Sequence, residues 1–247
     1  MKKVTVGIVD SGYGFRQSPP MGTERVVSSK AFRYGDNGVE QGLVTEDSLG
    51  HGSAILEIVA GQAPQAEFVI AQIFTERLTT TAVQVAAAID WLVEQKVDVI
   101  NMSLGLRSDR DALRYACEKA VAAGIIVCAS TPARGDPVYP ASYPGVFRMT
   151  GDARCSKPQI SCLKTQYADF GGYVQGRNGV VGASAGCAQM SGHIARYLTE
   201  GGDSDPAAVN DWLQQQAEFF GAEVRFPISE PDGVQTDGKQ NSGDQNG

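Results

Sequence analysis

Three short segments of the 247-residue chain could supply an acid, a base and a nucleophile, in that order. "GIVDSG" places Asp10 after an apolar run, "GHGS" places His51 between two glycines, and "VVGASAG" places Ser184 before an apolar segment. A serine hydroxyl becomes a good nucleophile when a base such as histidine takes its proton, and a buried carboxylate can orient that histidine. Together the three residues predict nucleophilic chemistry at a carbonyl carbon.

Each of the three residues also has an ordinary structural explanation. An aspartate after a strand often caps a turn, and Gly-x-Ser before a helix is often an N-cap. A lone histidine at the start of an apolar helix is commonly a capping or packing residue, and the helix dipole disfavours its charged form there. The combination favours catalysis, because each residue stands at the end of an element where a site would form.

The neighbours of these residues have possible chemical uses. The small residues beside His51 and Ser184 would let a substrate backbone approach closely. Ser184 at a helix N-terminus would also aim free N–H groups at a developing oxyanion. Both expectations depend on the elements that position the three segments.

Those elements alternate along the chain. β-Branched apolar runs without strict polar alternation are typical of strands buried on both faces, and they occupy residues 3–10, 67–74, 97–104 and 124–130. Helical patterns lie between and after them, at residues 52–61, 81–96, 109–124, 184–201 and 205–220. We expect Ser108 or Asp109 to cap the third helix and Gly124 to close it. The order predicts an α/β fold, a doubly wound and mostly parallel sheet with helices on both faces, and sites at the carboxyl ends of the strands.

The remaining segments determine the expected domain organisation. Residues 131–180 are rich in Gly, Pro, Tyr and Arg, and we interpret them as loops and short strands over the same core. From about Pro227 the chain is too polar to fold, with mostly Gly, Asp, Gln, Asn and Ser. We therefore expect a single domain over residues 1–226 and a disordered tail over residues 227–247.

Composition excludes several classes of function. The net charge of −7 leaves no basic block to neutralise nucleic-acid phosphates. No run of about 18 apolar residues could cross a membrane. The first apolar run is interrupted at Asp10, which indicates a strand and not a signal peptide. Five cysteines, an odd number without a dense framework, suit a reduced cytoplasmic protein.

Neither a metal nor another cofactor is expected. No second cysteine or histidine pair with zinc spacing accompanies Cys155 and Cys162, so we interpret these two as solvated loop cysteines. Cys187 is interpreted as a small core residue, and His193 as a surface or packing residue. A nucleotide-binding domain is excluded as well, because "DSGYG" has the wrong spacing for a phosphate-binding glycine loop.

The three segments resemble motifs of the subtilisin-like serine peptidases. "VGIVDSG" resembles the aspartate motif of this family, "HGSAILEIVAG" its His-Gly-Thr motif, and "GASAGCAQMSG" its serine motif. The chain order Asp, His, Ser is that of subtilisin. The resemblance covers about residues 4–200 and implies a subtilisin-like fold, with Asp10 as orienting acid, His51 as general base and Ser184 as nucleophile.

A fourth segment, "VINMSLG", matches the Asn-x-Ser-x-Gly segment of the same family. This resemblance implies that Ser103, Leu104 and Gly105 pair with the substrate backbone and line the pocket for the residue before the cut. A nearby loop contains Asp136 and Tyr139, followed by Tyr143, and could border the same groove.

The chain departs from the family at the oxyanion hole. The family supplies an Asn side chain there, but gap-free counting puts the corresponding position near Pro132 or Ala133, neither of which can donate a hydrogen bond from its side chain. Ser130, Thr131 or Arg134 could substitute, and the backbone N–H of Ser184 remains. The loss of one such donor typically lowers the rate by about 10²–10³. The serine motif departs too, because residues 185–189 replace the usual Met-Ala and lack the proline.

The resemblance implies an endopeptidase that cuts a peptide or small protein partner through an acyl-enzyme. The size of the chain and its altered motifs resemble the small subtilisin-like enzymes that remove leader peptides from modified peptides, such as those that mature the small subunit of quinohemoprotein amine dehydrogenase. This narrower resemblance implies specific processing in the cytoplasm. The alternative is a catalytically impaired pseudoenzyme that binds a peptide in the same groove. The sequence leaves the oligomeric state open.

Overall fold

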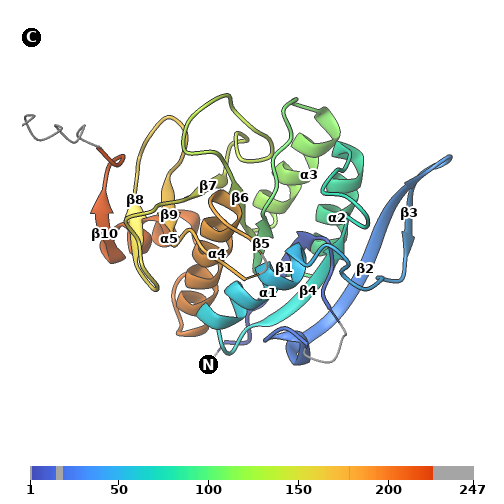
Figure 1. Ribbon diagram of the computed structural model, residues 1–247, viewed down its shortest axis with the longest axis horizontal. Coiled ribbons are helices and arrows are strands. Elements are labelled where there is room, and N and C mark those ends of the chain that lie inside the picture. Colours follow the sequence, from blue (N-terminus) through green and yellow to red (C-terminus); the bar gives the residue numbers. More distant parts are fainter. Residues whose placement is uncertain (1, 15–18, 178, 225–247) are drawn as a thin grey trace, which may run out of the picture.

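The computed structural model describes residues 2–14, 19–177 and 179–224 of the chain. Within these residues ten strands form one sheet in the order β10-β8-β9-β7-β6-β5-β1-β4-β2-β3 (Figure 1). The strands are β1 (Thr5–Asp10), β2 (Val26–Gly35), β3 (Gly38–Gly42), β4 (Glu67–Gln72), β5 (Val99–Met102), β6 (Ile126–Ser130), β7 (Val146–Gly151), β8 (Ile160–Cys162), β9 (Phe170–Gly172) and β10 (Ala217–Phe220). Only the β2–β3 and β8–β9 pairs among them are antiparallel. The predicted mostly parallel α/β sheet is confirmed.

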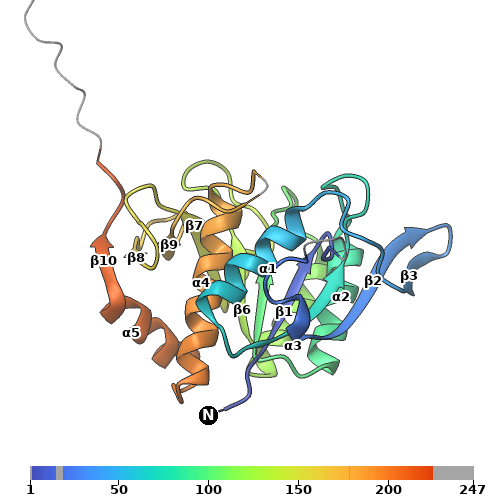
Figure 2. The same ribbon diagram turned by 60° about the horizontal axis from the view of Figure 1, so that its bottom comes forward.

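Helices cover both faces of this sheet. They are α1 (His51–Gln62), α2 (Ala82–Glu94), α3 (Asp111–Ala122), α4 (Ala183–Thr199) and α5 (Pro206–Gln216), and a 3₁₀ turn lies at Thr23–Arg25. Figure 2 shows α1 and α4 next to each other, and the two helices pack together against one face, whereas α2 and α3 pack together against the other. The N-termini of α1 and α4 therefore open at the same edge of the sheet.

Strand β1 shows why the sequences of the central strands are apolar at successive positions. Val6 and Ile8 belong to the core beneath α1 and α4, whereas Val9 belongs to the core beneath α2 and α3. Successive side chains of a strand point to opposite faces, so a strand covered on both sides needs apolar residues throughout. Gly7 faces α2, where an added Cβ would lie 2.8 Å from Leu92.

The helix ends agree with the sequence in part. The prediction that Ser108 or Asp109 caps α3 is wrong, because the N-cap residue is Arg110 and its side chain makes no capping hydrogen bond. Asp109 instead accepts a hydrogen bond from the hydroxyl of Tyr143 at 2.8 Å. Gly124 follows α3 with φ of 78°, the left-handed conformation expected of a closing glycine.

The last predicted helix is shorter than expected. Asp205 caps α5 by accepting from the backbone N–H groups of Ala207 and Ala208. The helix ends at residue 216, and residues 217–220 form β10, which pairs with β8 in parallel. Pairing with a sheet edge overrides the helical pattern here, because β10 gains ladder hydrogen bonds that a frayed last turn would lack.

The sequence did not predict the hairpin of β2 and β3, which projects from one end of the molecule (Figure 1). Its strands are half-buried or exposed for most of their length, so the continuous apolar signal of a central strand is missing. The turn signal is present, since Asp36 and Asn37 connect the paired residues Gly35 and Gly38, and Gly38 has φ of 104°.

The expected domain boundary at residue 226 and the tail over residues 227–247 fall outside the described residues, so the single domain stays a prediction. None of the helices in the described ranges is long and apolar enough to span a membrane.

Candidate active site

Asp10 ends β1 at the carboxyl edge of the sheet and is completely buried. Its Oδ1 lies 2.7 Å from Nδ1 of His51 and also accepts the backbone N–H of Ser11 at 2.7 Å. Its Oδ2 is buried without a hydrogen-bond partner among the described residues. The structure therefore brings Asp10 into contact with His51, which comes from a segment 41 residues away.

His51 is the first residue of α1, and its ring is held by Asp10. A carboxylate only accepts hydrogen bonds, so the contact with Asp10 fixes the proton of the neutral ring on Nδ1 and leaves the lone pair on Nε2. Burial alone lowers the pKa of His51. The hydrogen bond to Asp10, the charge of Asp10 and the charge of Asp47 outweigh burial, so the pKa lies above the ordinary value of 6.5.

The two glycines beside His51 meet requirements of the backbone. Gly50 has φ of 70°, a left-handed conformation that favours glycine. A Cβ on Gly52 would lie 2.3 Å from the carbonyl oxygen of Gly12 and would collide with the turn after Asp10. At Gly52 the expectation that a small residue makes room for a substrate is wrong, because the turn after Asp10 already fills that space.

Asp47 holds the first turn of α1, a role that sequence reasoning missed. Its Oδ1 accepts the backbone N–H of Gly50 at 2.8 Å, and its Oδ2 accepts the N–H and the hydroxyl of Ser53 at 2.8 and 2.7 Å. The signal was an aspartate shortly before an apolar helix, the pattern of a helix start. Asp47 thus fixes the helix end that carries His51 and adds a negative charge near the ring.

Ser184 is the second residue of α4 and is half-buried. Its Oγ donates to the carbonyl oxygen of Ser103 at 3.2 Å, and the Ser103 hydroxyl donates in return to the carbonyl oxygen of Ser184 at 3.1 Å. Two hydrogen bonds therefore link the start of α4 to the end of β5. A Cβ on Gly186 would lie 2.0 Å from the carbonyl oxygen of Thr150, so this glycine lets α4 pack on β7.

A groove of about 400 Å³ brings the predicted residues together. His51 and Ser184 line it, together with all three residues predicted to bind substrate, Ser103, Leu104 and Gly105. The groove is also lined by the segment between β4 and α2, which sequence reasoning did not single out, and by the residues that follow Gly105. These additional lining residues are Phe74, Leu78, Thr79, Thr80, Leu106 and Arg107.

None of the three candidates for the missing Asn side chain lines this groove in the described structure. The hydroxyl of Ser130 donates to the carbonyl oxygen of Leu104 at 3.3 Å. Thr131 and Arg134 line two other cavities. The first turn of α4 offers a different kind of donor, because no side chain of the described residues caps its N–H groups.

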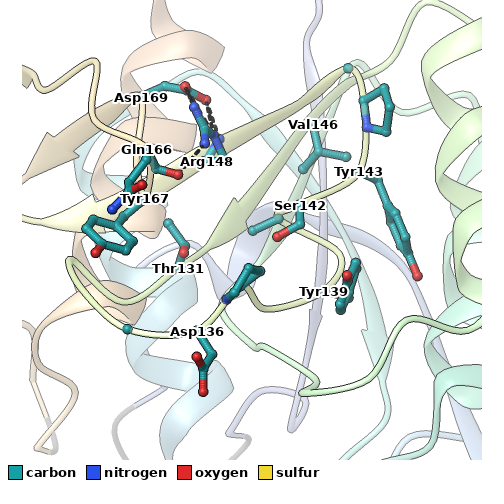
Figure 3. A pocket seen from close by; sticks show the side chains of 15 residues that line it. Thr131, Asp136, Tyr139, Ser142, Tyr143, Val146, Arg148, Gln166, Tyr167 and Asp169 are labelled. Carbon is teal, nitrogen blue, oxygen red and sulfur yellow. Dashed lines mark hydrogen bonds and ion pairs between the residues drawn. The ribbon is translucent and has the colours of Figure 1, made fainter.

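The aromatic loop also lies elsewhere. Tyr139, Tyr143 and Asp136 line a separate cavity of about 690 Å³, shown in Figure 3, where the Arg148–Asp169 ion pair forms part of the wall. None of these three residues lines the groove of His51 and Ser184 among the described cavities. The backbone of Tyr139 pairs with that of Leu106, which lines the groove, so this loop lies next to the groove.

The cysteines and the second histidine are interior residues. Cys155 and Cys162 are buried and form no disulfide, so their interpretation as solvated loop cysteines is wrong. Cys187 is completely buried in α4, as expected of a small core residue. His193 is buried in the same helix, and burial lowers its pKa to about 4.

Comparisons with known proteins agree with this architecture. The sequence profile of the Subtilase family matches residues 1–150. The major intracellular serine protease of Bacillus subtilis (strain 168) is 30% identical over 165 residues, which make up 60% of this chain and 50% of that protein. The alignments with this and two similar curated relatives cover 29–55% of the relatives' lengths.

Two solved structures show the same fold. A lanthipeptide protease is 18% identical with a TM-score of 0.64, covering 87% of this chain and 80% of that one. The prenylagaramide maturation protease PagA is 18% identical with a TM-score of 0.58, covering 85% of this chain and 82% of that one. Because the family profile matches more than half of the chain, the chain belongs to the subtilase family.

Proposed function

We propose that this chain is a serine endopeptidase in which Asp10, His51 and Ser184 form the catalytic triad. One observation carries the proposal. Nδ1 of His51 lies 2.7 Å from a completely buried carboxylate, and His51 and Ser184 line one groove. A buried carboxylate beside a histidine stabilises the imidazolium that forms when the histidine takes a proton.

The acylation half of the reaction follows from these positions. Ser184 Oγ leaves its hydrogen bond to the Ser103 carbonyl and gives its proton to Nε2 of His51 while it attacks the carbonyl carbon of the substrate. The tetrahedral intermediate then collapses, and His51 returns the proton to the leaving amine nitrogen. The products are a free amine and an ester between the acyl group and Ser184.

Deacylation repeats the steps with water. His51 takes a proton from the attacking water, the hydroxide adds to the ester carbon, and the proton returns to Ser184 Oγ as the acid product leaves. Asp10 stays ionised throughout and keeps the Nδ1 proton of His51 in place. General-base assistance of this kind contributes about 10²–10⁴-fold to such a reaction.

The first turn of α4 supports stabilisation of the oxyanion. Its N–H groups have no side-chain cap among the described residues, and they stand at the positive end of a 17-residue helix. The backbone N–H of Ser184 belongs to this turn. The proposal therefore assigns the oxyanion to backbone donors and requires no amide side chain at position 132.

The groove wall supports a preference in the peptide segment before the cut. Phe74, Leu78 and Leu104 provide apolar surface, and Arg107 is the one permanently charged side chain among the described lining residues. No hydrogen bond or ion pair of the Arg107 side chain is present in the described part of the chain. We infer a substrate with apolar side chains on this segment and an acidic side chain within reach of Arg107.

A specific cut suits this groove better than bulk digestion, and we propose removal of a leader peptide or a similar processing step. Two proteins with the same fold, a lanthipeptide protease and a prenylagaramide maturation protease, support this choice. A relative described as intracellular and the buried free cysteines support a cytoplasmic location.

A second candidate is a peptide-binding pseudoenzyme with the same groove. The observation in its favour is the hydrogen bond of Ser184 Oγ to the Ser103 carbonyl oxygen, which engages the nucleophile away from His51. The absence of a side-chain donor at Pro132 points the same way. The two candidates differ in whether His51 activates Ser184.

Reaction with a fluorophosphonate probe, followed by intact-mass analysis, separates them. An endopeptidase takes up a single adduct, which Ser184→Ala and His51→Ala both abolish while the variants stay folded. Ser191→Ala is a matched control, because Ser191 is a buried serine of the same helix whose hydroxyl donates to Asn101. Folded parent protein that takes up no adduct would favour the pseudoenzyme.

A further inference from the structure

Gln72 is the last residue of β4 and lies beside Asp10 in the sheet. The two residues are register partners in the β1–β4 pair, and Gln72 is 1% exposed. The catalytic proposal gives this buried side chain no role. A buried amide group needs hydrogen-bond partners for its donors and its acceptor, so its contacts show which segments of the chain it connects.

The amide group of Gln72 is fully engaged. Nε2 donates to the carbonyl oxygens of Ser11 and Thr45 at 2.8 and 3.0 Å. Oε1 accepts from the backbone N–H and the hydroxyl of Thr45 at 2.9 and 3.3 Å. Two carbonyl oxygens and one backbone N–H allow only one orientation of the amide. One side chain therefore joins the turn after β1 to the loop before α1.

Each of these two segments supports one member of the acid–base pair. Ser11 donates its backbone N–H to Asp10 Oδ1 at 2.7 Å, and its hydroxyl accepts the N–H of Gly52 at 2.8 Å. Thr45 stands two residues before Asp47, which holds the first turn of α1. The space around the amide is filled as well, since a Cβ on Gly12 would lie 2.7 Å from Gln72 Nε2.

We propose that Gln72 is a positioning residue that sets the contact between Asp10 and His51 by holding Ser11 and Thr45 together. Its catalytic consequence rests on the proposed function, whereas its effect on the ring of His51 does not. Gln72 touches neither reacting atom in this arrangement. It acts through the turn of Ser11 and the loop of Thr45.

Removal of the amide therefore changes a measurable property of His51. With the two segments untied, the hydrogen bond between Asp10 and His51 weakens while burial of the ring persists. The pKa of His51 then falls, because burial lowers it and the charges that raise it act from a greater distance. The charged groups that face the ring are Asp10 on β1 and Asp47 before α1, and Arg107 lines the same groove.

The test compares Gln72→Met and Gln72→Asn with Gln84→Met. Gln84 is a matched control because it is also a buried glutamine that donates to a backbone carbonyl, that of Phe32, but it lies on α2 beneath the other face of the sheet. The chain has two histidines, so NMR titration of labelled histidine resolves His51 from His193 in each variant. Fluorophosphonate labelling gives the inactivation rate per folded site.

We expect Gln72→Met to lower the titration midpoint of His51 by about one pH unit, the low end of the effect of an adjacent carboxylate. The labelling rate per folded site falls about 10- to 100-fold, with little change in probe affinity, as for a small misplacement of reacting groups. Gln72→Asn shows the same changes to a smaller extent. Gln84→Met changes stability alone.

Two results separate this proposal from the proposed function. A parent protein that takes up no probe contradicts the endopeptidase, but the His51 midpoint still tests Gln72. A folded Gln72→Met or Gln72→Asn variant with the parent midpoint overturns the positioning role, whatever the labelling shows. The milder Asn variant keeps the test available if the Met variant does not fold.

Discussion

The first turn of α1 carries the proposed base and the first turn of α4 the proposed nucleophile. The two turns differ in whether side chains accept hydrogen bonds from their backbone N–H groups. In α1 the N–H of Gly52 donates to the hydroxyl of Ser11, and the N–H of Ser53 donates to Asp47. In α4 no side chain of the described residues caps the first turn, and Ser184 is held only through Ser103. Two helices on the same face of one sheet thus differ at their N-termini. We call the N-terminus of α1, whose N–H groups are bonded to side chains, the closed end, and the N-terminus of α4, whose N–H groups have no side-chain cap among the described residues, the open end.

This difference agrees with the charge expected beside each helix end during the proposed reaction, a positive imidazolium beside α1 and a negative oxyanion beside α4. The positive end of a helix dipole disfavours an imidazolium, so α1 needs nearby negative charge, which Asp10 and Asp47 supply. The first turn of α4 contains no acidic residue and no side-chain cap among the described residues, so we expect its positive end to stabilise an anion. We therefore expect substitutions in α1 to act through His51, and substitutions in α4 to act through the oxyanion.

The largest effect is expected from Asp10→Asn. An uncharged amide neither stabilises the imidazolium nor fixes the ring proton on Nδ1, so the labelling rate should fall about 10⁴-fold. The pKa of His51 should fall as well, because burial then acts with less opposition. The rate is measured with the fluorophosphonate probe and the pKa by NMR. Asp98→Asn is the control, since Asp98 binds the N–H of Thr5 at the opposite end of β1. A rate within tenfold of the parent would contradict the triad.

The second prediction tests the open end of α4 by adding a negative charge there, like the charges that Asp10 and Asp47 place near the N-terminus of α1. Ala183→Asp places a carboxylate in the first turn, where it should strengthen the helix slightly and repel the oxyanion. We expect labelling to slow by about 10- to 100-fold, somewhat less than the loss of one oxyanion donor. Ala183→Asn has nearly the same shape without the charge and should label at close to the parent rate. Equal rates for the two variants would argue against a backbone oxyanion site.

The closed end of α1 is tested by Asp47→Ala. The variant loses the acceptor of Gly50 and Ser53, which should destabilise the fold by about 1 kcal/mol. It also removes a charge that raises the pKa of His51, so the midpoint of labelling against pH should move down. Asp205→Ala is the control, because it removes a cap from α5 and should lower stability alone.

The raised pKa of His51 also makes the stability of the fold depend on pH. The pKa of His51 is raised in the fold, so its ion pair stabilises the fold fully below about pH 6.5, and the effect is lost as the pH rises through the folded-state pKa. Asp47→Ala should therefore be more destabilising in mild acid than in mild alkali. Urea unfolding at about pH 6 and pH 9 measures this, and an equal loss at both values would contradict it.

The sequence predicted the central part of this arrangement because the relevant signals are local. Asp10, His51 and Ser184 each follow or begin a strongly apolar element, so their places at the carboxyl edge follow from the βα order. The hairpin of β2 and β3 and the strand β10 were missed. β3 and β10 are the edge strands of the sheet and β2 is next to β3, and all three are half-exposed or exposed for most of their length, so they lack a continuous apolar pattern.

Within the site, the supporting contacts were beyond the reach of the sequence. Gln72 and Thr45 are 27 residues apart, and no local pattern marks a buried amide that joins two segments. The role of Gly52 was misjudged for a related reason. Its missing Cβ could serve a substrate or another part of the chain, and only the position of Gly12 decides between them.

The smallest effect on chemistry is expected at the far end of α1. Arg25 donates to the carbonyl oxygens of Ala63 and Ala66 at 2.8 and 3.0 Å and to that of Ala60 at 3.3 Å, so a side chain from outside the helix completes its C-terminus. Arg25→Ala should cost about 2 kcal/mol of unfolding free energy, the size of a hydrogen bond to a charged group. Arg25→Lys keeps the charge without the fork and should lose part of that stability.

The labelling rate per folded site should be unchanged in both Arg25 variants, because Ser11 and Asp47 hold His51 independently of the other end of its helix. Urea unfolding and intact-mass labelling of the same samples measure the two quantities together. A labelling rate that fell in proportion to stability would mean that the first turn of α1 is held by the whole helix and not by its own contacts. The contrast between the closed end of α1 and the open end of α4 would then lose its local cause.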